Sequence, residues 1–322
     1  MAVLGGFRAR ACAPALLPAL LLVLLTGCSE DVDQAHAVQT RLGRTDHVVA
    51  SDVTLPTADR GAEIALDVQA GLTPAQVVAL AADVAETAID EDYLAYRLTL
   101  REAGTPTDAL VVDDDFGTDP RAAAVVWHWQ RLASAILGEI TYRYQPDAEI
   151  VEVETVGSLV HDVEEAGRIG YGSTATTWRF ADGGSVYVDS GRLQPEDVLL
   201  VQRVQRTVAS PSLPVPAPDW RLETRADHVL LDLPVVLPQG SVAAAALTVP
   251  TYELPLQSLA LGAFDALSVS SRPTWLRLHQ RAVDGDDDDD VFGWWASDQP
   301  PLPGRDPLHR GWDTWLEGVA GA

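Results

Sequence analysis

Carboxylates are the most frequent side chains here that could do chemistry, and one run of them suggests calcium binding. Asp286–Asp290 is an unbroken acidic run that follows Asp284 and Gly285. A calcium loop of the helix–loop–helix kind, if it began at Asp284, would need Gly at its sixth position and Glu at its twelfth. Those positions hold Asp289 and Trp295. We therefore interpret the run as a solvated acidic segment and expect no metal site, with loose Ca²⁺ association through several carboxylates as the alternative.

A second group of carboxylates is Asp113–Asp115. Dispersed acids can act as general acid and base when two of them face each other in a cleft, so a hydrolase is kept as one alternative. Asp115, Phe116 and Gly117 also match the metal-binding tripeptide of protein kinases. The chain has no Lys, and that chemistry requires a lysine that pairs with phosphate. The tripeptide is therefore interpreted as a strand end that runs into a turn.

The seven His residues are scattered along the chain, and no pair has the spacing of a zinc-binding helix. His161 and Asp162 belong to the best acid–base cluster by composition, which is most simply an exposed helical turn. His128 lies between two Trp residues on a predicted helix and is interpreted as a surface or interface residue. No serine nucleophile elbow occurs. The sequence indicates no catalytic residue and no cofactor, and it favours a non-enzymatic role.

Seven of the nine Trp residues fall into two groups by their surroundings in the sequence. Trp178, Trp220 and Trp275 lie on predicted strands, where we expect them to be core. Four others lie in a polar, Pro-rich C-terminal segment and are candidates for binding through their rings: Trp294, Trp295, Trp312 and Trp315.

The charge balance excludes some classes of partner. The chain carries 22 basic and 47 acidic residues, a formal net charge of −25. All the basic residues are Arg, because Lys is absent. So negative a chain repels nucleic acid and anionic lipid headgroups, and we expect no nucleic-acid partner.

The N-terminus has the composition of a secretory signal. Arg8 and Arg10 precede an apolar run over residues 16–25, which is short of the roughly 20 residues that a membrane-spanning helix needs. The run ends at four residues with a small residue and a glycine before a cysteine: Leu25, Thr26, Gly27 and Cys28. This segment resembles the lipobox of bacterial lipoproteins. The resemblance is specific, and it covers only residues 1–28.

The resemblance implies a cellular location for the protein. In that family the cysteine thiol receives a diacylglycerol and the signal is cut before it, so residues 1–27 would be removed and Cys28 would become the lipidated first residue. Two acyl chains give stable anchoring. We therefore expect a protein held by its lipid on the extracytoplasmic face of the cell membrane. Since Cys12 would leave with the signal, no disulfide is expected in the mature chain.

The first patterned block is predicted at residues 61–160, after a flexible tether over residues 28–60. Glu63–Val68 reads as a strand, and Thr73 followed by Pro74 opens a helix because the first suits the N-cap and the second the first turn. Strands at Asp92–Glu102 and Ala109–Asp113 follow, then a second helix after Pro120 and two more strands. The order β-α-β-β-α-β is that of a ferredoxin-like fold.

The second patterned block is predicted at residues 170–283. Asp182-Gly183-Gly184 is a hairpin signal between two strands. From Val188 onward the sequence predicts the end of a strand, then a glycine, a proline and an apolar helix. The same order of features begins at Val68. An internal duplication is one interpretation of this match, and chance is the other. Residues 284–322 form an acidic, Trp- and Pro-rich tail.

Together these patterns predict an α+β fold of antiparallel sheets with helices packed on one face, with two ferredoxin-like halves as the candidate arrangement. The function favoured is a membrane-anchored envelope module that binds or assembles with an envelope protein or glycan. A solute-binding lipoprotein of a transporter and the carboxylate hydrolase are the alternatives.

Overall fold

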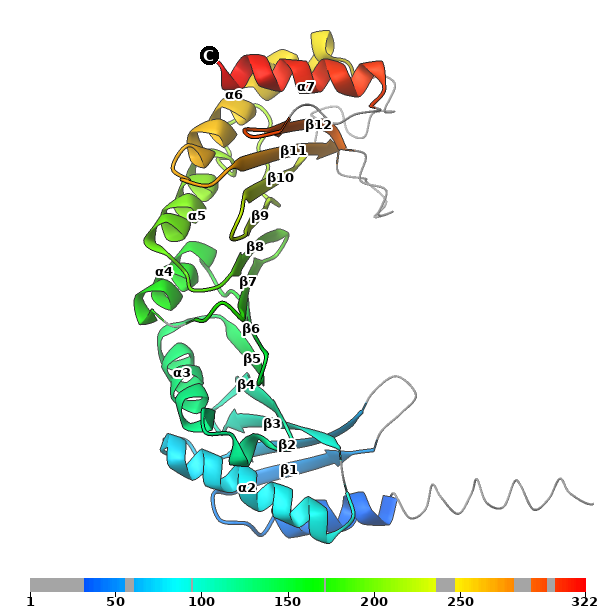
Figure 1. Ribbon diagram of the computed structural model, residues 1–322, viewed down its shortest axis with the longest axis vertical. Helices are drawn as coiled ribbons and strands as arrows, with labels where there is room; N and C mark the ends of the chain where they lie inside the picture. Colours follow the sequence, from blue (N-terminus) through cyan, green and yellow to red (C-terminus); the bar gives the residue numbers. More distant parts are fainter. Residues whose placement is uncertain are drawn as a thin grey trace, which may run out of the picture.

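The computed structural model describes residues 32–55, 61–93, 95–170, 172–235, 247–280, 291–299 and 305–322. Within these ranges the chain alternates between a pair of strands and a helix (Figure 1). The strands are β1 (Val48–Thr54), β2 (Ala62–Val68), β3 (Tyr96–Glu102), β4 (Thr105–Asp113), β5 (Glu139–Gln145), β6 (Ala148–Glu154), β7 (Thr176–Asp182), β8 (Ser185–Ser190), β9 (Arg221–Thr224), β10 (Val229–Val235), β11 (Thr274–Gln280) and β12 (Val291–Ala296). The helices are one at residues 32–42, α2 (Pro74–Asp90), the short 3-10 helix η1 (Phe116–Thr118), α3 (Ala122–Ala135), α4 (Leu159–Ile169), α5 (Pro195–Thr207), α6 (Val249–Leu267) and α7 (Pro307–Ala320).

The described strands form one sheet in which each strand lies beside its neighbours in sequence, from β1 to β12. The two strands of each hairpin are antiparallel, and the strands joined through a helix, such as β2 and β3, are parallel. The sheet is therefore mixed. The fold is α+β and consists of consecutive ββα units stacked side by side.

Several helices begin with the same local chemistry. Thr73 caps α2 and accepts a hydrogen bond from the backbone N–H of Gln76, with Pro74 next in the chain. Asp306 caps α7 in front of Pro307. A cap oxygen binds an N–H that has no partner within the helix, and Pro in the first turn has no N–H to leave unpaired.

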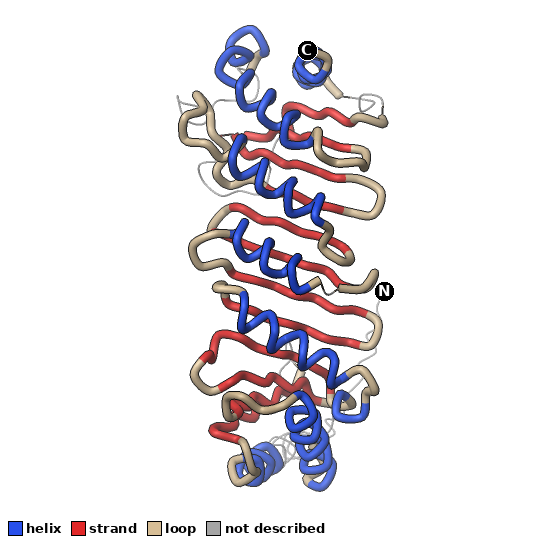
Figure 2. Tube along the Cα trace, turned by 90° about the vertical axis from the view of Figure 1, so that its left-hand side faces the viewer, coloured by secondary structure: helices blue, strands red, loops and turns tan. Residues whose placement is uncertain are grey.

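All the labelled helices lie on one face of the sheet, and the assembly bends into an arc with the helices outside (Figures 1 and 2). Two strands occupy about 9.6 Å across the sheet and one helix about 10 Å, so the helical layer holds one helix for every two strands. The slightly wider helical layer takes the convex side. In the described part of the chain, no helix lies on the concave face of the sheet (Figure 1).

Successive units run in opposite directions. The turn at 103–104 between β3 and β4 lies at one rim of the sheet, and the turn at 146–147 between β5 and β6 lies at the other, because β4 and β5 are parallel. The turns at 183–184 and 225–228 continue the alternation. Each helix connects two parallel strands and so forms a crossover. Because all these helices lie on one face while the strand direction reverses from one crossover to the next, consecutive crossovers have opposite handedness, although right-handed crossovers dominate in proteins.

The expected antiparallel sheets and ferredoxin-like halves are not confirmed. The element order β-α-β-β-α-β is present from β2 to β5, but a ferredoxin-like sheet inserts another strand between the first two of that series. Here β3 pairs directly with β2 over seven residues, from Ala62↔Tyr96 to Val68↔Glu102. No place is left between them, so the chain extends the sheet outward in place of closing a compact half.

The sequence match between Val68 and Val188 falls on equivalent turns of two different units. Gly71 follows β2 with a φ of 77°, and Gly191 follows β8 with a φ of 115°, both in the left-handed region that favours glycine. Each turn then leads into a helix with Pro in its first turn. The repeated sequence pattern is the turn between the hairpin and the helix of a ββα unit, and its two occurrences lie three units apart.

Two segments predicted to lie outside the patterned blocks contribute regular elements. Residues 32–42, placed in the tether, form a helix whose Val38 and Leu42 are fully buried. Residues 291–296 and 307–320, placed in the tail, form β12 and α7 and complete the last unit. The acidic run Asp286–Asp290 lies outside the described residues.

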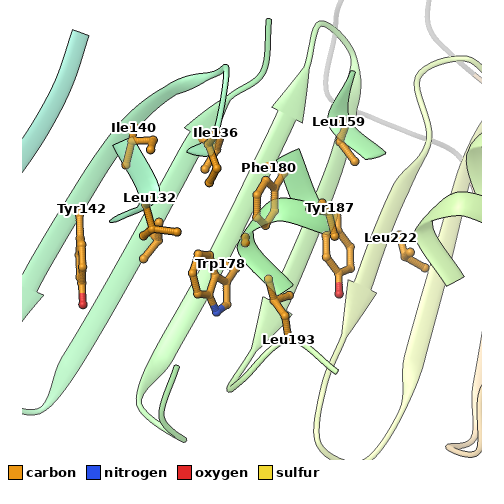
Figure 3. Close-up of a cluster of buried hydrophobic side chains, with 14 of the residues drawn as sticks. Leu132, Ile136, Ile140, Tyr142, Leu159, Trp178, Phe180, Tyr187, Leu193 and Leu222 are labelled. Atoms are coloured by element: carbon orange, nitrogen blue, oxygen red, sulfur yellow. The ribbon is translucent and has the colours of Figure 1, made fainter. Parts of the chain in front are cut away.

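A single apolar core runs through the whole arc, between the sheet and the helices. In its central part Trp178 stacks on Phe180 with ring centroids 5.9 Å apart, and Phe180 stacks on Tyr187 at 6.0 Å. Leu132 of α3 and Leu222 of β9 belong to the same cluster (Figure 3). Side chains from successive units thus share one core.

Buried polar clusters recur inside this core. Tyr187 donates to Asp189 at 2.9 Å, and Thr224 of the next strand donates to the same carboxylate. Tyr142 and Thr176 bind Glu149 in the same way at 3.4 and 3.0 Å. Each cluster joins neighbouring strands and satisfies an acid that would otherwise be buried without partners.

The Asp189 cluster predicts a pH dependence of stability. Burial raises the pKa of Asp189 to about 6, so the folded chain holds this proton more tightly than the unfolded chain between about pH 4 and 6. We expect the free energy of unfolding to fall as the pH rises through that window, by up to about 3 kcal/mol from this group. Urea unfolding of the wild type and of Asp189→Asn at pH 4, 5, 6 and 7 measures the contribution.

The difference between the two pH profiles isolates Asp189 from the other acids. Asp83→Asn, at an exposed position of α2, is the control for the change in net charge. We expect the Asp189→Asn profile to lose its decline between pH 4 and 6 relative to the wild type and the control. Parallel profiles of all three proteins would show that Asp189 ionises alike in the folded and unfolded chains.

Candidate functional site: the concave face of the sheet

The concave face is formed by the side chains that alternate with buried ones along the strands. Arg143 of β5 lies between the buried Tyr142 and Tyr144, and Glu152 of β6 lies between two buried valines. Residues in these positions point away from the helices. The residues of the concave face are therefore those that alternate with the buried residues along each strand, and they are the more polar of the two sets.

Ion pairs between neighbouring strands cross this face at intervals along the arc. Most of these side chains are partly exposed, and a pair between exposed side chains contributes at most about 1 kcal/mol. The pairs are Arg101–Asp67 at 3.0 Å, Arg143–Glu152, Arg179–Glu154 at 2.8 Å and Arg277–Asp232 at 2.5 Å. The strongly acidic chain thus presents locally balanced charge on this face, where a protein partner could make its own polar contacts.

An aromatic cluster lies at the C-terminal end of the concave face. The imidazole of His228 stacks on Trp275 with centroids 3.7 Å apart and planes at 15°. Trp294 lies 5.7 Å from Trp275 and is in register with Arg277. The indole N–H of Trp275 donates to Asp298 at 2.9 Å. Both Trp rings are partly exposed, so they offer an apolar platform held by fixed partners.

An acidic cleft of about 590 Å³ opens at the other end of the arc, on the rim that carries the turn at 146–147. Glu63, Arg97 and Asp113–Asp115 line it, together with Tyr96. The cleft forms where β2 and β3 begin and β4 ends, because β3 is antiparallel to β4. Burial and the negative charge of Asp114 raise the pKa of Tyr96 well above its usual value.

Asp113–Asp115, the acids on which the hydrolase alternative rests, thus line one cleft together with Glu63. Within the described ranges, no three His, Cys, Asp or Glu side chains converge so as to hold a metal ion. The side chains that line the cleft can attract a cation through charge and hydrogen bonds. They supply no pair of groups that we can assign as acid and base.

The structure separates the four tryptophans that were predicted to bind. Trp294 lies on the concave face. Trp295 points to the opposite face and packs edge-on against Phe264 at 4.9 Å. Trp312 is fully buried and donates to the carbonyl of Leu247 at 2.8 Å, and Trp315 packs against it at 5.2 Å. Only β12, with its alternation of faces, distinguishes Trp294 from its neighbour.

The strand tryptophans also divide. Trp178 and Trp220 are fully buried, as predicted, whereas Trp275 lies on the concave face. Among the His candidates, His128 is half-buried on α3 and burial lowers its pKa to about 4. Asp162, expected in an exposed turn, is buried and accepts a hydrogen bond from the backbone N–H of Leu137 at 3.1 Å.

Residues 1–28, in which Leu25, Thr26, Gly27 and Cys28 carry the resemblance to a lipobox, lie outside the described residues. None of the helices in the described ranges combines the length and the apolar character needed to span a membrane. No protein-family model, curated protein or solved structure matches the chain.

The different positions of the tryptophans predict different effects on stability. Trp312→Ala should lower the free energy of unfolding by about 3–5 kcal/mol, because it leaves a cavity in the core and an unpaired carbonyl at Leu247. Trp294→Ala removes a partly exposed ring and should cost less than half as much. Urea unfolding of the two variants measures both values. Equal losses would mean that Trp294 is as deeply packed as Trp312.

Proposed function

We propose that this protein is a lipid-anchored module of the cell envelope that binds a protein partner on the concave face of its sheet. The observation that carries the proposal is the face itself. In the described chain it runs along twelve strands with no helix over it, while the other face is covered throughout. Repeat architectures use extended concave surfaces of this kind for binding.

The dimensions of the face favour an extended partner segment. Twelve strands spaced about 4.8 Å apart span about 50 Å, which corresponds to about 15 residues of extended chain. The paired charges along the face offer sites for a partner's polar groups, and the Trp275 and Trp294 platform offers an apolar anchor. Binding energy in protein interfaces is concentrated in such aromatic anchors.

The anchor rests on the N-terminal sequence. Residues 1–28 resemble a lipoprotein signal, and this supports a mature protein held to the extracytoplasmic face of the membrane through Cys28. The alternative of a solute-binding lipoprotein requires two lobes around a cleft. A single continuous sheet in the described chain gives that alternative less support than the open face gives to partner binding.

Lipidation is tested by intact-mass analysis of protein extracted from membranes. We expect the wild type to begin at Cys28 with the added mass of a diacylglyceryl group, because the thiol is the group that the lipid modifies. Cys28→Ser should lack that mass and leave the membrane fraction. A wild-type protein that is secreted freely without lipid would contradict the anchor.

Partner binding is tested by cross-linking on intact envelopes with variants of the two faces. Trp275→Ser/Trp294→Ser alters the concave face, and Trp127→Ser alters an exposed ring on the outer face of α3. We expect the concave variant to capture at least about tenfold less of the partner bound by the wild type, and the outer variant to capture it normally.

Thermal unfolding of each variant confirms that it folds before capture is compared. Loss of the partner in the Trp127→Ser variant, with retention in the concave variant, would place the interface on the helical face. Equal capture by all three proteins would remove the support for binding through the concave face.

A further inference from the structure

The acidic cleft continues onto the concave face through a second, smaller hollow. The cleft of about 590 Å³ and a hollow of about 130 Å³ share Arg97 and Asp113 in their walls. The hollow is also lined by apolar side chains of the concave face, among them Val111 and Ile150. Ile150 is 38% exposed, which is unusual for a large apolar side chain on a strand. A charged space and a more apolar one therefore follow each other.

The charge in the cleft is unbalanced. Its lining contains four carboxylates, those of Glu63 and Asp113–Asp115, and one guanidinium, that of Arg97. Glu63 accepts a hydrogen bond from Thr99 at 2.7 Å. Arg101–Asp67 is the pair that lies nearest along the sheet, and within the described residues none of the four carboxylates that line the cleft forms an ion pair of this kind. A cation that enters the cleft would meet an uncompensated negative potential.

A buried hydroxyl in the same wall has no partner of its own. Tyr96 lines the cleft and is only 6% exposed, and its hydroxyl makes no hydrogen bond within the described part of the chain. A buried hydroxyl without a partner is costly to the fold. Its proximity to Asp114 places it on the acidic side of the cleft. It is therefore available to accept a hydrogen bond from a bound ligand.

We infer that the cleft binds the cationic side chain of an Arg or Lys residue in an extended peptide segment, with an apolar residue of that segment in the adjoining hollow. The carboxylates of Asp113–Asp115 receive the cation, and the Tyr96 hydroxyl accepts one of its N–H groups. Val111 and Ile150 contact the apolar residue. This inference rests on the proposed function, since it names the chemistry of the partner at one end of the concave face.

The experiment is a titration of the full-length, detergent-extracted protein with a fluorescent peptide, Gly-Arg-Gly-Leu-Gly, followed by anisotropy. A second peptide carries citrulline, which keeps the shape of arginine but is neutral. We expect the arginine peptide to bind at least about tenfold more tightly than the citrulline peptide, and its affinity to fall with added salt. Equal affinity for the two peptides would overturn the inference.

Variants separate the cleft from the bulk charge of the protein. Asp113→Asn/Asp114→Asn/Asp115→Asn should weaken binding of the arginine peptide at least about tenfold. The matched control, Asp83→Asn/Glu86→Gln/Asp182→Asn, changes the net charge by the same amount at exposed sites outside the cleft and should bind as the wild type does. Equal weakening by both triple variants would mean general attraction to an acidic protein.

Tyr96→Phe tests the hydroxyl alone. It removes a group with no partner in the described chain, so stability should be unchanged or slightly higher while peptide affinity falls about fivefold. Unchanged affinity would contradict the role of Tyr96. Displacement of the peptide by millimolar Ca²⁺ but not by agmatine would overturn the inference in favour of a metal site. If no peptide binds while envelope capture still requires the concave face, this inference fails and the proposed function stands.

Discussion

Every unit of this protein has one apolar face on its hairpin and one on its helix, and neither can be buried by the unit alone. Leu132 of α3 and Trp178 of β7 reach the same cluster from different units. Neighbours must therefore stack, as in other repeat architectures. This requirement orders the strands by sequence, sets the helices on one side and leaves the continuous core between the two layers.

The same requirement leaves the other face of the sheet uncovered. A hairpin two strands wide and a helix have nearly the same width, so one helix per unit is all that the convex side can hold. The concave face is kept soluble by its own side chains, through the cross-strand pairs such as Arg179–Glu154. Its two ends differ from the middle: one carries the Trp275 and Trp294 platform, and the other the acidic cleft.

Much of the local structure could be predicted because it depends on interactions between residues that are close in sequence. Strands at Glu63–Val68 and Ala109–Asp113 and the helix after Thr73 follow from alternation and capping. The order of strands in the sheet could not be predicted, because the same order of elements serves a compact ferredoxin-like half and an extending arc. What distinguishes the two is whether β3 pairs directly with β2, and this pairing is not local in sequence.

The candidate site shows the same division. Asp113–Asp115 was recognisable as a group of carboxylates, but its cleft also needs Glu63 and Arg97 from other strands. The tryptophans were recognised as unusual, yet adjacent residues of β12 point to opposite faces, so composition alone cannot separate Trp294 from Trp295. The recurring proline at the start of the helices, at Pro74, Pro195 and Pro307, was the available sign of a repeat.

Because successive units run in opposite directions, their hairpin turns alternate between the two rims of the sheet. Turns at 103–104 and 183–184 emerge on one rim, and those at 146–147 and 225–228 on the other. Gain or loss of a single unit would move every later turn to the opposite rim and turn all later strands end for end. A change by two units would preserve both rims. A chain with this architecture therefore keeps its later turns on the same rims only when units are gained or lost in even numbers. A pair of units is the smallest segment whose duplication or deletion leaves the two rims unchanged.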